Sequence, residues 1–220
     1  MVYGQASALA ADGAHIVRTD EMTGIQALER TDGKPMRPGD VERVEFEYIR
    51  HGTQCLLANF DVVSGHVIAP TVSDTRTEAD VVTHLRQTVA LDPEAPWIFM
   101  LDQLNTHTSE SLVRWVAEAC GLTEELGVKG KAGILMSMES RAAFLSDSTH
   151  RIRLVYTPKH ASWLNQIDIW FSLLVRRLLK RGNFHSQQHL KERILAFIHY
   201  FNVTLAKPFQ WTYKGKALTI

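Results

Sequence analysis

The stretch Trp97-Ile98-Phe99-Met100-Leu101-Asp102 decides the fold. Its five consecutive apolar residues have the length of a strand and are far too few to span a membrane. A run that is apolar at every position, without polar alternation, is typical of a strand covered on both faces. We therefore expect residues 97–101 to form a central strand of a sheet, with the carboxylate of Asp102 directly at its end.

Strands are also expected on either side of this run. Residues 15–19 predict a strand that ends at Asp20, and residues 53–71 predict a β-hairpin with its turn at Ser64-Gly65. Alternating apolar residues over 152–156 predict one more strand. The sheet should therefore combine antiparallel strands from the first part of the chain with later strands joined by helices.

Helices are predicted between and after these strands. Thr77 and Ser109 can each cap a helix whose apolar residues recur at helical spacing. A long amphipathic helix is expected from about 163 to 178, and a last helix after Ser186. The order predicts an α/β fold, a mixed sheet with helices on both faces.

The remaining segments fit a single domain over 1–220. Glycines and prolines over 31–40 predict a surface loop, and residues 121–150 suit an insertion before the last strand. Residues 161–220 would form basic C-terminal helices. Cys55 and Cys120 make no CxxC pair and suit buried free thiols in a reducing cytoplasm. We find no signal peptide and no membrane segment.

Charge is distributed unevenly along the chain. Residues 1–150 carry 12 Lys and Arg against 22 Asp and Glu, whereas residues 151–220 carry 12 against 2. Such asymmetry suggests that the basic part has a polyanionic partner, although basic helices packed against an acidic body would give the same numbers.

Three aspartates stand out by their positions. Asp20 and Asp102 each follow a predicted strand, and Asp168 lies inside the long helix, where aspartate is not favoured. Each one alone could equally fill a turn, cap or exposed position. Together they suit a site for Mg²⁺, which prefers oxygen ligands and serves in-line phosphoryl displacement.

Three stretches resemble bacterial insertion-sequence transposases of the mariner superfamily, which have a DDE-type catalytic domain. They are TDEMTGIQALER (19–30), LDQLNTH (101–107) and PKHASWLNQIDIWF (158–171). The resemblance continues to KPFQWT (207–212), so it covers nearly the whole chain. It implies a ribonuclease-H-like fold, with Asp20, Asp102 and Asp168 at the positions of the catalytic metal triad.

The chain departs from this family in two respects. The third acidic position of this branch is usually glutamate, whereas this chain has Asp168, as in other mariner relatives. The family also begins with helix-turn-helix modules, for which there is no room before Asp20. The sequence therefore suggests a truncated copy or one half of a split protein.

Further residues are candidates for supporting roles. His107 suits either a partner that orients the metal ligands or a residue at the start of a helix, and Asn165 shares a polar stripe with Asp168. Trp163 and Trp170 fit the apolar side of the helix better than a platform for stacking bases. The candidates for contacts with DNA phosphates, which could also be a solvated helix end, are Lys159, His160, Arg176, Arg177, Lys180 and Arg181.

The resemblance implies a nucleotidyltransferase that uses Mg²⁺ or Mn²⁺ to cleave double-stranded DNA at element ends and to join those ends to target DNA. It is compatible with a homodimer and with a bacterial cytoplasmic protein at the nucleoid. Two alternatives remain open at this point. One is a catalytically inactive remnant that binds DNA, and the other is a ribonuclease-H-like nuclease that acts on other nucleic acids.

Overall fold

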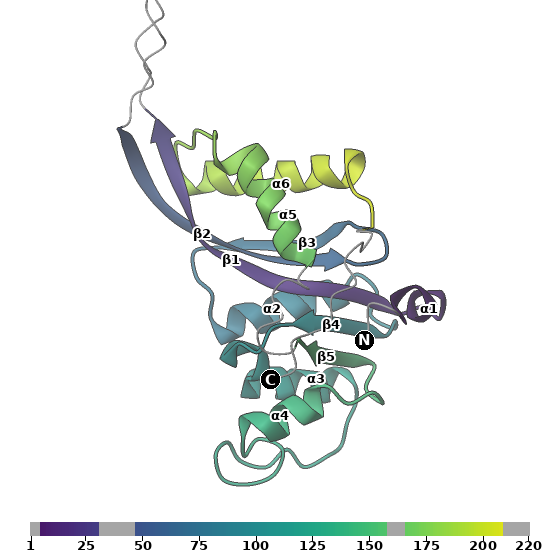
Figure 1. The fold of residues 1–220 in the computed structure, drawn as a ribbon. Helices are drawn as coiled ribbons and strands as arrows, with labels where there is room; N and C mark the ends of the chain where they lie inside the picture. The colour runs from purple at the N-terminus through teal and green to yellow at the C-terminus, as the bar shows by residue number, and fades with distance from the viewer. Residues whose placement is uncertain (1–4, 31–46, 158–165, 209–220) are drawn as a thin grey trace, which may run out of the picture.

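The computed structural model describes residues 5–30, 47–157 and 166–208. Within them, five strands form one sheet in the order β3-β2-β1-β4-β5 (Figure 1). β1 pairs antiparallel with β2, and β2 with β3, whereas β4 is parallel to both β1 and β5. The expected mixed sheet is thus confirmed. Its strands are β1 (His15–Arg30), β2 (Tyr48–Asp61), β3 (Val67–Ser73), β4 (Trp97–Leu101) and β5 (Ile152–Tyr156).

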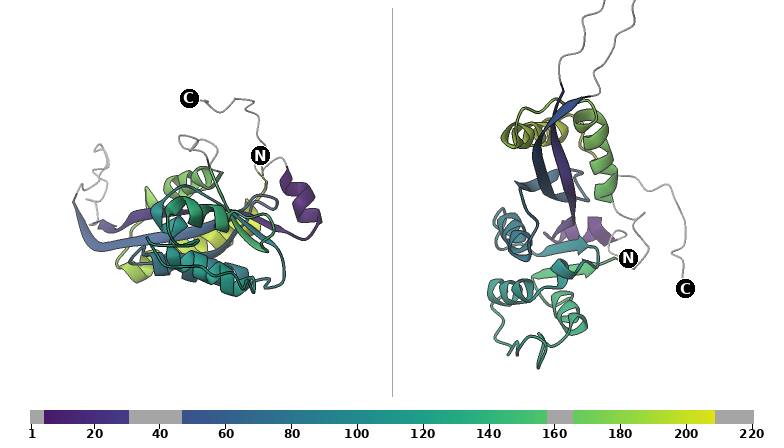
Figure 2. Two further views of the ribbon diagram at one scale, coloured as in Figure 1. Left: turned by 90° about the horizontal axis from the view of Figure 1, so that it is seen from below. Right: turned by 90° about the vertical axis from the view of Figure 1, so that its left-hand side faces the viewer.

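Helices cover both faces of this sheet, and Figure 2 shows α1 and α5 on one side with α2 and α3 on the other. The α-helices are α1 (Ala6–Ala11), α2 (Glu78–Val89), α3 (Glu110–Ala119), α4 (Met138–Leu145), α5 (Gln166–Leu174) and α6 (Gln187–Thr204). A 3₁₀ turn, η2 (Asn105–Thr108), precedes α3, and a π-helical segment, η4 (Val175–Leu179), follows α5. No helix in the described ranges has the length and apolarity needed to cross a bilayer.

The strand predicted at residues 97–101 is confirmed as β4, and all five of its residues are buried. Phe99 and Leu101 pack in the cluster that contains α2 and α3, while Ile98 and Met100 pack on the opposite face beside α1. The continuous apolar run therefore reflects a strand that is paired on both edges and covered on both faces.

The prediction that the first strand ends at Asp20 is wrong. β1 continues to Arg30, because β2 remains paired with it through two irregularities in register, the first between Met22 and Ile25. Gly24 lies within that irregularity at φ 67°. A bulge interrupts the alternation of side chains, and this explains why the alternating pattern predicts a strand that is too short. Figure 1 shows β1 and β2 leaving the sheet as a two-stranded ribbon.

The predicted caps explain where the helices begin. The side chains of Thr77, Ser109 and Ser186 each accept a hydrogen bond from a backbone N–H in the first turn of α2, α3 and α6. The long helix is confirmed over α5, but its hydrogen bonding changes to π-helical at Val175. The short helix α1 was not predicted, because it buries only Ala6 and shows no clear periodicity.

Residues 121–150, predicted as an insertion, contain α4 and contribute to the main core. Leu135, Phe144 and Leu145 pack in the cluster with α3 and β5. The buried Arg141 donates to the carbonyl of Thr108 at 2.8 Å, which joins α4 to η2. The predicted loop at 31–40 lies outside the described residues. Cys55 and Cys120 are free thiols; Cys55 is buried as expected, whereas Cys120 is half-buried.

The helix α6 lies along the outer edge of β3. The side chain of Asn202 accepts from the backbone N–H of Val67 at 2.9 Å and donates to its carbonyl at 2.8 Å. Trp170 of α5 has its ring next to Phe201 of α6, so the two helices share one apolar cluster with β2. An edge strand is thereby covered, and α5 is held against the sheet.

A buried histidine connects α2 to β3. His84 has no exposed surface, and its Nδ1 forms a 2.8 Å hydrogen bond with the Thr71 hydroxyl. Its Nε2 is buried without a hydrogen-bond partner among the described residues. Burial lowers the pKa of His84 to about 3, so this ring is neutral in the folded protein.

Acid should therefore destabilise the fold through His84. Below about pH 6.5 the unfolded chain binds a proton at this residue that the folded chain excludes. The free energy of unfolding of the wild type should fall by roughly 1.4 kcal/mol more per pH unit than that of His84→Gln between about pH 6 and pH 4. Urea denaturation at several pH values measures this difference. The exposed His199→Gln should retain the wild-type slope, whereas parallel curves for the wild type and His84→Gln would contradict the assignment.

Candidate active site

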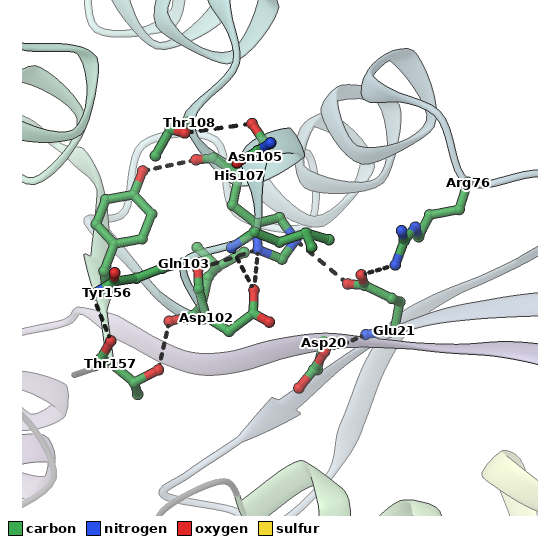
Figure 3. Close-up of polar contacts among 12 residues, drawn as sticks. Asp20, Glu21, Arg76, Asp102, Gln103, Asn105, His107, Thr108, Tyr156 and Thr157 are labelled. Carbon is green, nitrogen blue, oxygen red and sulfur yellow. Dashed lines mark hydrogen bonds and ion pairs between the residues drawn. The ribbon is translucent and has the colours of Figure 1, made fainter. Parts of the chain in front are cut away.

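Two of the three predicted aspartates lie next to each other because of strand register. In the parallel pair β1 and β4, Arg18 is opposite Met100. Two residues further along each chain are Asp20 and Asp102. Figure 3 shows both side chains in one view, that of Asp20 on β1 and that of Asp102 at the end of β4. Carboxylates at adjacent positions of this kind can hold a cation between them.

The carboxylate of Asp102 is held in one orientation. Its Oδ1 accepts a hydrogen bond from His107 Nδ1 at 2.7 Å and from the backbone N–H of Leu104 at 3.1 Å. The hydrogen bond from His107 holds the pKa of Asp102 below its usual value, and the charge of the buried Arg18 adds to this effect. Asp102 is thus ionised at neutral pH, and its side chain is 47% exposed.

His107 lies between two carboxylates. Its side chain is 1% exposed, and its Nε2 lies 3.4 Å from Oε2 of Glu21. Burial alone would lower the pKa of His107, but the interactions with Asp102 and Glu21 outweigh it and raise this pKa to about 9. The hydroxyl of Tyr156 donates to the His107 carbonyl at 2.7 Å. The ring is therefore a cation held between two carboxylates, and it fixes the orientation of Asp102. Whether it orients a metal ligand stays a prediction.

The end of β4 is anchored to β5 just beside this site. The backbone N–H and the hydroxyl of Thr157 both donate to the carbonyl of Leu101, at 2.9 and 3.2 Å. The side chain of Gln103 donates back to the Thr157 carbonyl at 3.1 Å. The backbone on both sides of Asp102 is thereby fixed, and Asp102 can reach solvent from a rigid base.

Glu21 was missed by the sequence analysis although it follows Asp20 directly. Its side chain is 6% exposed and forms an ion pair with Arg76, which precedes α2. Its backbone N–H donates to Oδ1 of Asp20 at 2.8 Å. An acid inside a strand signals a buried partner, but the predicted strand ends at Asp20, so Glu21 falls just outside it. The partner itself, His107, is distant in sequence and gave no local signal.

Asp168 lies in the first turn of α5, and its residue is exposed. Its carbonyl accepts a hydrogen bond from the Ser172 hydroxyl at 2.9 Å. Over the ranges that the structure describes, no group of three or more His, Cys, Asp or Glu side chains lies close enough to hold a metal ion. A triad that includes Asp168 therefore stays a prediction.

The described part of the predicted basic surface is exposed on η4 and the turn that follows it. Arg176, Arg177, Lys180 and Arg181 all have exposed side chains. The other predicted members, Lys159 and His160, and the predicted supporting residue Asn165, lie outside the described residues. These exposed cations form two pairs, separated by Leu178 and Leu179, that could contact a polyanion.

Residues 15–191 match the family model described as DDE superfamily endonuclease. The chain belongs to this endonuclease family. The match begins at the first residue of β1 and ends within α6, so the DDE endonuclease domain contains the whole sheet together with Asp20, Asp102 and Asp168. The DDE-type character that the sequence resemblance implied is thereby confirmed. No curated protein matches the chain.

The fold of this DDE endonuclease domain is similar to that of Mos1 transposase. The structure of a Mos1 paired-end complex with the left transposon end matches with a TM-score of 0.52 and 15% identity, over 90% of this chain and 53% of the Mos1 chain. A pre-cleavage Mos1 transpososome matches with a TM-score of 0.50 and 14% identity, over 91% of this chain and 58% of that chain. The likeness confirms the ribonuclease-H-like fold. The chain spans little more than half the length of these Mos1 chains.

Proposed function

We propose that this DDE endonuclease domain is the catalytic domain of a DNA transposase, which cleaves DNA strands at element ends and joins them to target DNA. The observation that carries the proposal is the placement of two carboxylates: Asp20 lies in β1 and Asp102 directly follows β4, each two residues beyond the paired residues Arg18 and Met100. The fold supports it, since it is shared with Mos1 transposase.

The residues of the site suit a divalent cation. Mg²⁺ and Mn²⁺ take oxygen ligands, and both aspartates offer carboxylate oxygens. The described hydrogen bonds of Asp102 use Oδ1, so Oδ2 is the oxygen available to a cation within the described part of the chain. The lowered pKa of Asp102 keeps this ligand ionised. We infer that Mg²⁺, or Mn²⁺ in its place, is the cofactor.

Asp168 is our proposed third ligand. Asp20 and Met22 project from the same face of β1, because they are two residues apart in a strand. Met22 packs against the cluster that contains Ile167 and Trp170 of α5, and α5 contacts β1. The first turn of α5, which includes Asp168, therefore belongs to the side of the sheet from which Asp20 projects. This shared side supports a triad.

In this proposal the three aspartates bind metal and His107 orients one of them. Two divalent ions, when bound, activate the attacking oxygen and stabilise the leaving oxygen of an in-line displacement. Asp20, Asp102 and Asp168 would hold these ions, and His107 would keep Oδ1 of Asp102 turned inward so that Oδ2 faces the substrate. Cleavage by water and joining by a 3′-hydroxyl are both in-line displacements, so one set of residues can serve both.

Double-stranded DNA is the partner we propose. Phosphates would lie along the exposed cations of η4 and the following turn, Arg176, Arg177, Lys180 and Arg181, together with Lys159 and His160. The Mos1 paired-end complex contains the left transposon end, which supports the same substrate class here. We further propose a homodimer and a bacterial cytoplasmic location at the nucleoid.

Metal-dependent nicking is the direct test of the proposed chemistry. The chain should convert supercoiled plasmid to the nicked form with millimolar Mg²⁺ or Mn²⁺ and not with EDTA. Asp20→Asn, Asp102→Asn and Asp168→Asn should each lower the rate by at least about 100-fold, more than is usual for residues that only orient ligands. Asp92→Asn, a surface aspartate bonded to His15, should retain the wild-type rate.

Three results would contradict parts of this proposal. DNA binding without nicking under any metal would identify an inactive remnant. Faster cleavage of RNA–DNA hybrids than of duplex DNA would identify a ribonuclease-H-like nuclease. Full activity of Asp168→Asn would remove that residue from the triad.

Salt dependence tests the proposed DNA surface. Changing Arg176, Arg177, Lys180 and Arg181 together to Gln should weaken duplex binding. It should also reduce the slope of log K against log salt by up to about 3.6, because each phosphate contact contributes about 0.9. Gel shifts over a salt series measure both quantities.

The matched control changes four exposed cations elsewhere, Arg86, Arg114, Lys129 and Lys131, to Gln. It removes the same charge from the region of α2, α3 and the loop after α3. An equal drop in slope for this control would show that only net charge matters and that η4 is not the binding surface.

A further inference from the structure

We propose that Glu21 is a positioning residue for the metal site, acting through His107 to hold the carboxylate of Asp102 in its metal-binding orientation. This inference deepens the proposed function and rests on it. Neither the family match nor the sequence motifs assign a role to Glu21. Its neighbour Asp20 is the residue expected to bind metal, so the two adjacent acids would have different tasks.

The strand itself separates the two acids. Successive side chains of a strand point to opposite faces. Asp20 follows the face of Ile16, which packs beside α1, whereas Glu21 follows the face of Val17, which packs against α2 and α3. Glu21 is consequently buried at 6% side-chain exposure. It faces the protein interior, where a carboxylate requires a partner.

A chain of contacts connects Glu21 to Asp102 (Figure 3). Arg76 pairs with Oε1 of Glu21, and Oε2 of Glu21 lies 3.4 Å from Nε2 of His107. On the other side of the ring, Nδ1 lies 2.7 Å from Oδ1 of Asp102. Positive and negative side chains alternate along this series of contacts. The series joins the segment before α2, the strand β1, the turn η2 and the end of β4.

The arrangement restricts the ring of His107 from both sides. If only Asp102 held the ring, rotation about the side-chain bonds could exchange the nitrogen that faces the carboxylate. With Glu21 opposite, both ring nitrogens have acidic partners, and each orients the other. Oδ1 of Asp102 is then occupied by the ring, and Oδ2 keeps a constant direction toward the proposed cation.

Glu21 is badly placed to be a metal ligand itself. The ring of His107 stands between its carboxylate and that of Asp102, and Arg76 takes its other oxygen. Oε2 accepts no hydrogen bond within the described residues, so His107 is the group that compensates this buried oxygen. Orientation of His107 is therefore the role that the geometry leaves for Glu21.

Manganese binding to the full chain without DNA tests the inference, with electron paramagnetic resonance reporting free Mn²⁺. Glu21→Gln should weaken Mn²⁺ binding about tenfold, the lower end of the range for residues that orient ligands. Glu29→Gln is the matched control, because Glu29 lies in the same strand and also contacts two histidines, His51 and His185. It should leave Mn²⁺ binding unchanged.

A double-mutant cycle separates positioning from simple loss of charge. If Glu21 acts through His107, Glu21→Gln should cause no further weakening in a His107→Gln background. A charge effect would give the same factor in both backgrounds and would overturn the inference. Should Glu21→Gln not fold, as judged by thermal melting, Glu21→Asp keeps the charge but shortens the reach. It should also weaken binding, and only when His107 is present.

Failure of the inference and failure of the proposed function give different results. If the wild type does not bind Mn²⁺, or if Asp102→Asn does not weaken binding, the proposed metal site is wrong. If Asp102→Asn weakens binding but Glu21→Gln equals the wild type, the metal site stands and the role of Glu21 is overturned.

Discussion

Parallel pairing of β1 with β4 is the constraint on which the candidate site depends. The strand β4 is paired on both edges and covered on both faces, so its position in the sheet is rigid. Register then brings Asp20 next to Asp102 at the point where β4 ends and its chain can turn toward solvent. Helices α2 and α3 stabilise one face of this pair, and α1 and α5 cover the other. A shift of one residue in this register would turn Asp20 toward the core and Glu21 toward the site.

Electrostatic balance is the second requirement of the site. Several acids close together repel one another unless cations compensate them. The protein supplies two cations of its own near Asp102, the buried Arg18 and the protonated His107, and a third, Arg76, beside Glu21. These groups keep Asp102 ionised and oriented. The carboxylate of Asp102 is also half exposed. It is therefore ionised, oriented and accessible, as a metal ligand must be.

Local signals were enough to predict much of the fold. The apolar run of β4, the capping residues Thr77 and Ser186 and the hairpin turn at Ser64-Gly65 are each encoded within a few residues. The extent of β1 could not be predicted, because a bulge near Gly24 hides the alternation and the partner strand lies elsewhere in sequence. The three aspartates are predicted by position and resemblance. The pairing of Glu21 with His107 needed the tertiary structure, since no spacing rule connects them.

Anomalous diffraction from crystals soaked in Mn²⁺ tests the central claim most directly, because it locates the metal without reference to activity. The proposed site predicts one or two anomalous peaks in contact with carboxylate oxygens of Asp20, Asp102 and Asp168. Peaks only at other positions, or a peak at Asp20 and Asp102 with Asp168 turned away from it, would contradict the three-aspartate site.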